Sequence, residues 1–306
     1  LLSQVYSIEL VHDYEELIRK YLTIISCQHI STDIQTHSKQ VFQKLLHTPQ
    51  LVQRSPEWFA FRLQRLTASA IAKIVGVGSY GDLRTTIREK CGETFPRFSN
   101  KAIMHGVIYE DVACRLYEAR ENTKIHEFGC VPHPNYPFLA ASPDGITEEG
   151  IAIEIKCPSG RKIKPTMPDY YWVQVQLQLE VMDLEICDFL EVRIEEYESQ
   201  SEFIYDTTAE YKGIVVEWYQ SSQQQLHYID FHQSSQSQLQ EMEEFKNKLL
   251  LDESNDTIIL RYWKLTEFSQ KRILRDKAWF SHNIDRLHNF WKVIEHYRSH
   301  PQSIST

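Results

Sequence analysis

Two carboxylates and a lysine lie close together near the middle of the chain, at positions that suit metal-assisted hydrolysis. Asp144 follows Pro143 in a turn-forming run, and Glu154 and Lys156 occupy alternate positions of a predicted strand soon after it. Mg²⁺ prefers hard oxygen ligands, so Asp144, Glu154 and the backbone carbonyl of Ile155 form a chemically suitable ligand set. A bound Mg²⁺ activates water for phosphodiester hydrolysis, and Lys156 would add positive charge beside the scissile phosphate.

The same residues also have a purely structural interpretation. Alternation over residues 151–156 places three isoleucines on one face of the predicted strand and Ala152, Glu154 and Lys156 on the other. A hairpin with a Pro-Asp-Gly turn and a Glu/Lys pair on one face is common in proteins without catalytic chemistry. The acid–acid–lysine spacing therefore predicts a nuclease site only if other residues agree with it.

A further carboxylate stands in a predicted helix over residues 101–121. Helical spacing places Glu110 on a stripe that otherwise consists of apolar residues: Ile103, Val107, Cys114 and Tyr117. A carboxylate on a core-facing stripe is costly to desolvate unless it is paired or bound to a metal. Glu110 is therefore a candidate metal ligand, and the alternative is an ion pair with a nearby arginine or lysine.

Charge is distributed unevenly along this chain of 306 residues, whose formal net charge is −9. Residues 54–101 carry nine lysines and arginines against four acids, and residues 156–164 carry four bases and no acid. Two basic segments in an acidic chain are compatible with nucleic-acid binding, although a solvated charged surface is the simpler interpretation of the charges alone. No run of apolar residues is long enough to predict a membrane span.

The cysteine pattern argues against a disulfide framework. Six cysteines are scattered without a CxxC pair, and the short spacing between Cys130 and His133 is weak evidence for zinc. Scattered thiols without a secretory signal favour a reducing, intracellular compartment.

Helices and strands are expected in an order typical of an α/β protein. Helices are predicted over residues 1–50, from Ser55-Pro56-Glu57 onward, over residues 239–251 and near the C-terminus, where aromatic residues repeat at core-like spacing. Strands are predicted within 124–141 and over 150–158, 187–197, 211–219 and 258–265. Gly76, Gly78 and Gly81 predict a loop, and the Ser/Gln-rich stretches 221–225 and 233–240 predict exposed connections.

Residues 170–182 give conflicting signals. Valines and leucines alternate there with Gln174, Gln176, Gln178 and Glu180, which by period alone indicates a strand. Glutamine, leucine and glutamate are nevertheless good helix formers, and the segment is long for a strand. The residues by themselves leave both possibilities open.

Five motifs, taken together and in order, resemble the lambda-exonuclease/YqaJ family of viral recombination nucleases, within the PD-(D/E)xK superfamily. The resemblance runs from Trp58 to about Met182. Its motifs are Trp58-x3-Arg62-x4-Thr67-Ala68-Ser69, His105-Gly106-x3-Glu110, Ser142-Pro143-Asp144-Gly145, Glu154-x-Lys156-Cys157-Pro158 and Tyr171-x2-Gln174-x-Gln176. The resemblance implies a helix over 170–182 and a restriction-endonuclease-like α/β core, with a mixed central sheet flanked by helices.

The resemblance also implies roles for individual residues. Asp144 and Glu154 would bind metal together with the Ile155 carbonyl, and Lys156 would be the catalytic lysine. Glu110 and Gln174 would support a second ion, the water or the phosphate. The implied cofactor is Mg²⁺, as two ions in the family's manner, and Mn²⁺ could replace it.

Three further residues would hold the end of the substrate. Arg62, Ser69 and Ser142 match family positions that grip a terminal 5′-phosphate, since arginine offers a fork of donors and hydroxyls add hydrogen bonds. The implied activity is Mg²⁺-dependent 5′→3′ digestion of one strand of linear duplex DNA, in viral recombination, repair or replication.

The family resemblance extends to domain organisation and partners. We expect an N-terminal helical extension over residues 1–53, an exonuclease core over 54–232 and a C-terminal helix–strand–helix extension over 233–306. The extension is similar to that of homologues from large eukaryotic DNA viruses of the African swine fever virus type. Expected partners are duplex DNA ends, a single-strand annealing or DNA-binding protein and further copies of the chain, without a membrane, in the host cytoplasm rather than the nucleus.

Two other functions remain open from sequence. A structure-specific endonuclease or resolvase of the same superfamily would share the metal chemistry without the grip on a DNA end. A non-catalytic scaffold that binds DNA or a host protein would keep the fold alone, although the complete acid–acid–lysine set argues against it. The iron–sulfur branch of these nucleases is disfavoured, because no cysteine follows Cys187.

Overall fold

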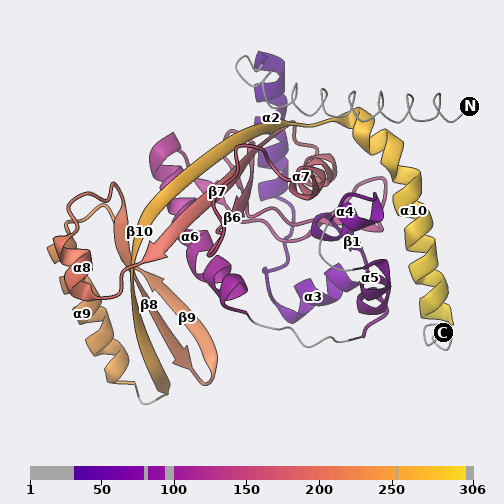
Figure 1. Ribbon diagram of the computed structural model, residues 1–306. Coiled ribbons are helices and arrows are strands. Elements are labelled where there is room, and N and C mark those ends of the chain that lie inside the picture. Colours follow the sequence, from indigo (N-terminus) through magenta and orange to yellow (C-terminus); the bar gives the residue numbers. More distant parts are fainter. Residues whose placement is uncertain (1–30, 79–81, 94–99, 253, 301–306) are drawn as a thin grey trace, which may run out of the picture.

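A mixed β-sheet forms the centre of the computed structural model, which describes residues 31–78, 82–93, 100–252 and 254–300 (Figure 1). Seven strands pair in the order β2-β5-β6-β7-β10-β8-β9. The pair β6–β7 is parallel, and the other neighbours in this sheet are antiparallel. The strands are β2 (Ile125–His126), β5 (Gly145–Thr147), β6 (Ala152–Lys156), β7 (Ile186–Glu196), β8 (Lys212–Gln220), β9 (Gln223–Tyr228) and β10 (Asn255–Leu274).

A smaller sheet of three strands, in the order β1-β4-β3, lies beside the main one. Its strands are β1 (Leu66–Thr67), β3 (Val131–Pro132) and β4 (Leu139–Ala141). β1 and β4 are parallel, with Leu66 opposite Leu139 and Thr67 opposite Ala140. The carboxyl ends of these two strands therefore meet at one edge.

Helices cover both faces of the main sheet, and separate clusters of buried residues fill the space beneath them. The larger cluster joins the sheet to α2 (Thr32–Leu46), α4 (Ile71–Ile74), α7 (Asp169–Met182) and α10 (Lys277–Ser299). A second cluster joins the opposite face to α6 (Lys101–Glu121), and a third packs α8 (Gln200–Tyr205) and α9 (Ser235–Leu250) on β8 and β10. The remaining helices are α3 (Pro56–Leu63), α5 (Leu83–Lys90) and the short 3₁₀ turn η2 (Ala68–Ala70).

The predicted α/β architecture, a mixed sheet flanked by helices, is confirmed. The ends of the predicted helices follow local sequence signals: the Ser55 side chain accepts from Trp58 N at 3.1 Å to cap α3, and the Asn100 side chain accepts from Ile103 N at 2.8 Å to cap α6. The predicted helix over residues 1–50 is α2 in its described part, and residues 1–30 lie outside the described residues. Of the predicted glycine loop, Gly76 and Gly78 are in a loop, and Gly81 lies outside the described residues.

Three sequence expectations are wrong in detail. Residues 221–225 and 233–240 were expected as exposed connections, but they contribute to β9 and to the first turns of α9. Hydrogen bonding to β8 orders the first, and Ser234 caps the second by accepting from Ser237 N at 3.2 Å. The strand predicted over 258–265 extends over 255–274, because β10 pairs with β8 on one side and β7 on the other.

Strand β10 connects two parts of the molecule that lie far apart in the sequence. Figure 1 shows it running from the part formed by β8, β9, α8 and α9 to the start of α10 on the opposite side.

The division of the chain into domains at residues 53/54 and 232/233 stays a proposal. Among the described helices, none combines the length and the apolar character needed to cross a bilayer.

Candidate metal centre and phosphate pocket

A tight hairpin brings the two candidate metal ligands together. In the β5–β6 pair Gly145 lies opposite Ile153, and Asp144 N donates to Ile153 O at 3.1 Å. The turn ends at Gly150, whose φ of +76° and close approach to Ser38 O leave no room for a side chain. Asp144 therefore lies across from the end of β6 that carries Glu154.

The backbone of Ile155 completes the link between the two ligands. Asp144 Oδ2 accepts a hydrogen bond from Ile155 N at 2.6 Å, beyond the last residue at which β5 pairs with β6. In a strand the N–H and C=O of one residue point to the same edge, so the Ile155 carbonyl is on the edge that Asp144 occupies. The Asp144 carboxylate and the Ile155 carbonyl thus lie at one edge of β6, and Glu154 is close enough for its charge to act on Asp144. The chemistry of these oxygen donors fits Mg²⁺.

Glu154 lies on the α7 face of β6 and is 1% exposed. Its Oε1 accepts from Gln174 Nε2 and its Oε2 from Gln178 Nε2, both at 2.6 Å, and Lys156 Nζ also contacts Oε1. These contacts agree with the predicted alternation, since Ile153 and Ile155 pack with α6 on the other face. Two glutamines on successive turns of α7 therefore hold both oxygens of the carboxylate.

Segment 169–182 is a helix, as the family resemblance implied, and the strand interpretation is wrong. Nine of the fourteen residues of α7 are buried and four more are partly buried, so the helix lacks the exposed polar face of an amphipathic helix. Gln174 and Gln178 both donate to Glu154, whereas Gln176 donates to Leu274 O and accepts from Asp276 N. The buried Oε1 of Gln178 has no hydrogen-bond partner among the described residues. Gln178 was not singled out from sequence, although its position four residues after Gln174 on a helix was the available signal.

Electrostatic interactions connect the carboxylates of this region. Burial, reinforced by the charges of Glu154 and Glu110, raises the pKa of Asp144 well above its usual range. Burial works to lower the pKa of Lys156, but Glu154 and Asp144 overcome it and raise the value. An excess of negative charge in a desolvated site is the condition that a divalent cation relieves.

Glu110 is placed differently from the sequence expectation. The buried face of α6 consists of Ile108, Tyr109, Val112, Ala113, Leu116 and Tyr117, whereas Ile103 is 54% exposed. Of the predicted stripe, Tyr117 is in the core and Cys114 packs against it, whereas Ile103 is exposed and Glu110 is partly buried. The core-facing prediction is therefore right only for the C-terminal end of the stripe. Glu110 Oε1 lies 3.4 Å from Arg54 Nη2, so the ion pair that was the alternative interpretation is present.

Burial nevertheless raises the pKa of Glu110, against the opposing charges of Arg54 and Lys156. The carboxylate oxygens of Glu110, Asp144 and Glu154 do not all lie within 4.8 Å of one another; the described residues that do so are His37, Asp183 and Glu185. That second group has other partners, because Arg275 bonds both of its carboxylates and Lys277 pairs with Glu185.

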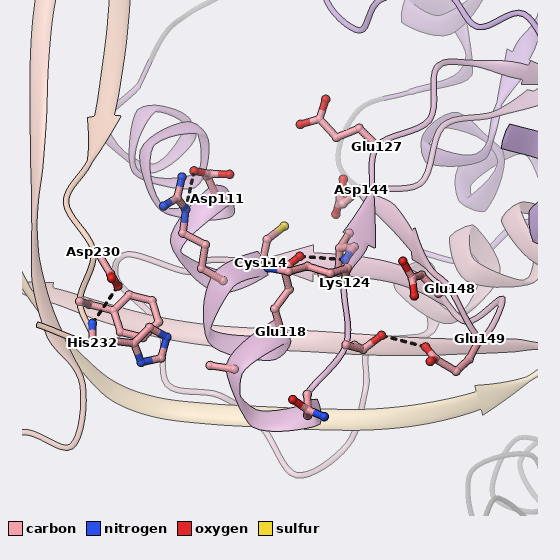
Figure 2. A pocket seen from close by; sticks show the side chains of 16 residues that line it. Asp111, Cys114, Glu118, Lys124, Glu127, Asp144, Glu148, Glu149, Asp230 and His232 are labelled. Atoms are coloured by element: carbon pink, nitrogen blue, oxygen red, sulfur yellow. Dashed lines mark hydrogen bonds and ion pairs between the residues drawn. The ribbon is translucent and has the colours of Figure 1, made fainter.

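Pockets of opposite character border the candidate metal ligands. Figure 2 shows Asp144 at the edge of a pocket of about 700 Å³ with six further carboxylates: Asp111, Glu118, Glu127, Glu148, Glu149 and Asp230. On the other side Glu110, Lys156 and Tyr171 line a groove with Arg161, and the predicted basic segment 156–164 begins there. A phosphate backbone is repelled by the first surface and attracted by the second.

A separate pocket of about 820 Å³ contains Arg62 and Ser69, together with Trp58, Lys73 and Lys90. The Arg62 guanidinium lies over the Trp58 ring at 4.3 Å, and Thr67 Oγ1 is 3.5 Å from Ser69 Oγ. Ser142 is not among the residues that line this pocket. It follows β4 as Ser69 follows β1, so the parallel pairing of these strands puts both hydroxyl residues at one edge.

Sequence and structure comparisons give relatives for this arrangement. Residues 57–185 match the model of the YqaJ-like viral recombinase domain. An uncharacterized protein of Acanthamoeba polyphaga mimivirus is 30% identical, over 84% of this chain and 55% of that protein. An African swine fever virus protein is 28% identical, over 40% of this chain and 44% of that protein. This chain therefore spans about half the length of the curated relatives it matches.

Among solved structures, an alkaline exonuclease from Laribacter hongkongensis is 20% identical, with a TM-score of 0.49, covering 82% of this chain and 98% of that chain. A phage-related exonuclease from Haemophilus somnus is 13% identical, with a TM-score of 0.42, covering 79% of this chain and 96% of that chain. The resemblance expected from the five motifs is confirmed by the family match: residues 57–185 of this chain are similar to the YqaJ-like viral recombinase domain.

Proposed function

We propose that the protein is a metal-dependent exonuclease that digests one strand of linear duplex DNA from a 5′-phosphorylated end. The observation that carries this proposal is the bond of Asp144 to the Ile155 backbone at the edge of β6, with the electrostatically linked Glu154 beside it and Lys156 in contact with Glu154. The cationic pocket around Arg62 supports the part of the proposal that concerns the DNA end.

Asp144, Glu154 and the Ile155 carbonyl would hold Mg²⁺, which Mn²⁺ can replace, and Glu110 would contribute to a second ion. When bound, the metal supplies a deprotonated water and neutralises developing charge on the phosphate. Lys156 would then leave Glu154 for the scissile phosphate, and Gln174 would keep the Glu154 carboxylate oriented. Tyr171, whose ring lies 5.1 Å from Lys156 Nζ, limits where that ammonium can go.

Arg62, Ser69 and Ser142 would bind the terminal 5′-phosphate. Ser142 is separated from Asp144 by Pro143 alone, so the chain that reaches the phosphate-binding edge continues directly into the metal site. Such a connection fixes the distance between the grip on a DNA end and the bond that is cut, which favours removal of nucleotides from that end.

The biological role follows from the viral relatives and stays within the proposal. We infer a role in viral recombination, repair or replication, in the host cytoplasm, with a single-strand annealing or DNA-binding protein as a partner for the 3′ strand left behind. Assembly of several copies around the duplex is also part of the proposal.

End dependence is the direct test of the function. The full chain is incubated with Mg²⁺ and three duplexes: linear with 5′-phosphate, linear with 5′-hydroxyl and covalently closed circular, each linear strand labelled separately. We expect rapid loss of the 5′-labelled strand from the phosphorylated linear duplex, slower loss from the hydroxyl duplex and an intact circle. Equal cutting of the circle would show an endonuclease instead.

Two variants separate the metal site from the end grip. Asp144→Asn should abolish digestion of every substrate, because the metal loses a charged ligand. Arg62→Ala should slow digestion of the 5′-phosphorylated duplex to the rate of the 5′-hydroxyl duplex. Retained activity in Asp144→Asn would remove the proposed metal site, and an unchanged preference in Arg62→Ala would remove the proposed grip.

A further inference from the structure

A buried lysine lies in the pocket that contains Arg62 and Ser69. Lys90, the last residue of α5, lines this pocket and is 9% exposed. Its ammonium donates to the carbonyl oxygen of Arg62 at 2.7 Å. Among the described residues it forms no ion pair with a carboxylate, and the charges of Arg62, Glu89 and Arg298 act on it from a distance. A buried ammonium without a directly bonded carboxylate is costly, since water has been removed and no anion in contact replaces it.

The surrounding charges increase this imbalance. Arg62, Lys73 and Lys90 contribute three cations to the pocket lining, and Glu89 and Glu93 contribute two carboxylates. Glu93 is engaged by the Arg88 guanidinium through two hydrogen bonds. Glu89 is exposed at the pocket rim, where solvent screens its charge. The interior of the pocket therefore has an unbalanced positive charge that suits a dianion.

The backbone of Lys90 is held in place from outside the pocket. Arg298 of α10 donates to Lys90 O through Nε at 2.9 Å and Nη2 at 2.7 Å. The same guanidinium donates to Leu63 O at 2.7 Å and to Gln64 Oε1 at 2.9 Å. The ends of α3 and α5 are thereby tied together, so Lys90 and Arg62 are held next to each other.

We propose that Lys90 is a direct ligand of a phosphate monoester bound in this pocket, in addition to Arg62, and that Arg298 positions it. This inference rests on the proposed function, in which the monoester is the 5′-terminal phosphate of a DNA strand. An ammonium has three donors, of which one is used by the Arg62 carbonyl, so donors remain for phosphate oxygens. Burial lowers the pKa of Lys90 to about 8, with Arg62 adding to the effect, and a bound dianion would reverse this shift.

Lys90→Met is the decisive variant, because methionine keeps the length and apolar stem of lysine and removes the charge. With inorganic phosphate as the probe, we expect the Tm of the wild type to rise with phosphate concentration, and the phosphate affinity of Lys90→Met to be at least tenfold weaker. In the absence of phosphate the variant should have a Tm equal to or above that of the wild type, since it loses an uncompensated buried charge.

Digestion assays extend the test to DNA ends. Lys90→Met should raise KM for the 5′-phosphorylated duplex about tenfold at unchanged kcat. KM for the 5′-hydroxyl duplex should not change. Lys44→Met, which removes an exposed lysine of α2 outside this pocket, is the control for general loss of positive charge and should leave KM for both duplexes unchanged.

The outcomes separate the two proposals. A lower Tm for Lys90→Met with unchanged phosphate affinity would overturn the ligand role and leave Lys90 as a cap for the carbonyls of α3. Phosphate binding that depends on Lys90, in a protein without nuclease activity, would support the phosphate pocket and overturn the exonuclease proposal.

Discussion

At the scale of single residues, the candidate metal site depends on side chains that orient other side chains. Glu154 is held by Gln174 and Gln178, each of which donates its amide to a different carboxylate oxygen. Groups that orient a metal ligand commonly contribute 10- to 100-fold to metal affinity, although they never touch the ion. Gln178, 1% exposed, is such a residue here.

Replacement of Gln178 by leucine should weaken Mn²⁺ binding about tenfold, because the Glu154 carboxylate loses one of its two amide donors. Isothermal titration of the full chain measures this directly. Gln176→Leu is the matched control on the same helix: it removes bonds to Leu274 O and Asp276 N, and should lower the Tm without changing Mn²⁺ affinity. Equal Mn²⁺ affinity in both variants would contradict an orienting role for Gln178.

Lys90 should make stability depend on pH in a defined window. Its pKa is about 8 in the folded chain and near its ordinary value of 10.5 in the unfolded chain. Between these values the unfolded chain binds more protons, so the free energy of unfolding rises with pH, by up to about 3 kcal/mol across the window. Lys90→Met lacks this contribution, and its advantage over the wild type should therefore shrink as pH rises from 7 to 10.

Urea unfolding of both proteins at several pH values gives that difference. The comparison with Lys90→Met is needed because other groups face the ammonium: Arg62 from α3, Glu89 from α5, Arg298 from α10 and the thiol of Cys130 before β3. Burial raises the pKa of this thiol, so Cys130 titrates in the alkaline range in both proteins. A constant stability difference at all pH values would show that Lys90 is not desolvated in solution.

At the scale of helices and strands, α10 lies outside the matched residues 57–185 and links helices that lie within them. The helix starts at the Asp276 cap, which accepts from Trp279 N at 3.0 Å, and packs on α4, α5 and α7 through Trp279, Leu287, Trp291 and Ile294. Near its end Arg298 bonds the C-terminal ends of α3 and α5. An element beyond residue 185 therefore shapes a pocket whose lining residues lie within residues 57–185, the part that matches the YqaJ-like domain.

Arg298→Met should raise KM for a 5′-phosphorylated duplex about three- to tenfold at unchanged kcat, because Arg62 and Lys90 lose their common support. Arg286→Met is the control from the same helix, since Arg286 Nη1 donates to Val75 O at 3.0 Å, away from the pocket lining. Both variants should lose about 1–3 kcal/mol of stability, from unsatisfied carbonyls. A KM shift of the same size in both would assign the effect to helix packing in general.

At the scale of the whole molecule, one apolar core spans the YqaJ-like domain and the strands that follow it. Tyr109 and Leu116 of α6 belong to the same buried cluster as Trp263 of β10. Trp263 is 1% exposed and packs against Gly213, where even a Cβ atom would come within 2.7 Å of its ring. Since α6 also carries Glu110, the strand that completes the sheet helps to set one wall of the candidate site.

Trp263→Ala should lower the free energy of unfolding by about 3–5 kcal/mol, the usual result of emptying a site filled by a large aromatic side chain. Calorimetry of the wild type should give one transition for the core that α6, β6, β7 and β10 share. Two separate transitions, with only the later strands affected by the substitution, would instead support independent folding of residues 54–232 and 233–306.

Sequence by itself determined the features that depend on neighbours along the chain. The alternation of residues 151–156 is a local property of a strand, so it predicted that Glu154 and Lys156 share a face. Serine at position 55 predicted a helix start for the same reason, since a cap bonds to a backbone group a few residues away. The order of the five motifs predicted the family.

Tertiary structure decided which of these local features meet. Gln178 reaches Glu154 because α7 packs across β6. Most residues of α7 are buried, so its sequence lacks the polar face by which a helical period is recognised. Glu110 borders a groove instead of the core because α6 turns a neighbouring face to the sheet. Lys90 and Arg298 meet across 208 residues of chain, a contact that depends on how α5 and α10 pack and that no spacing in the sequence encodes.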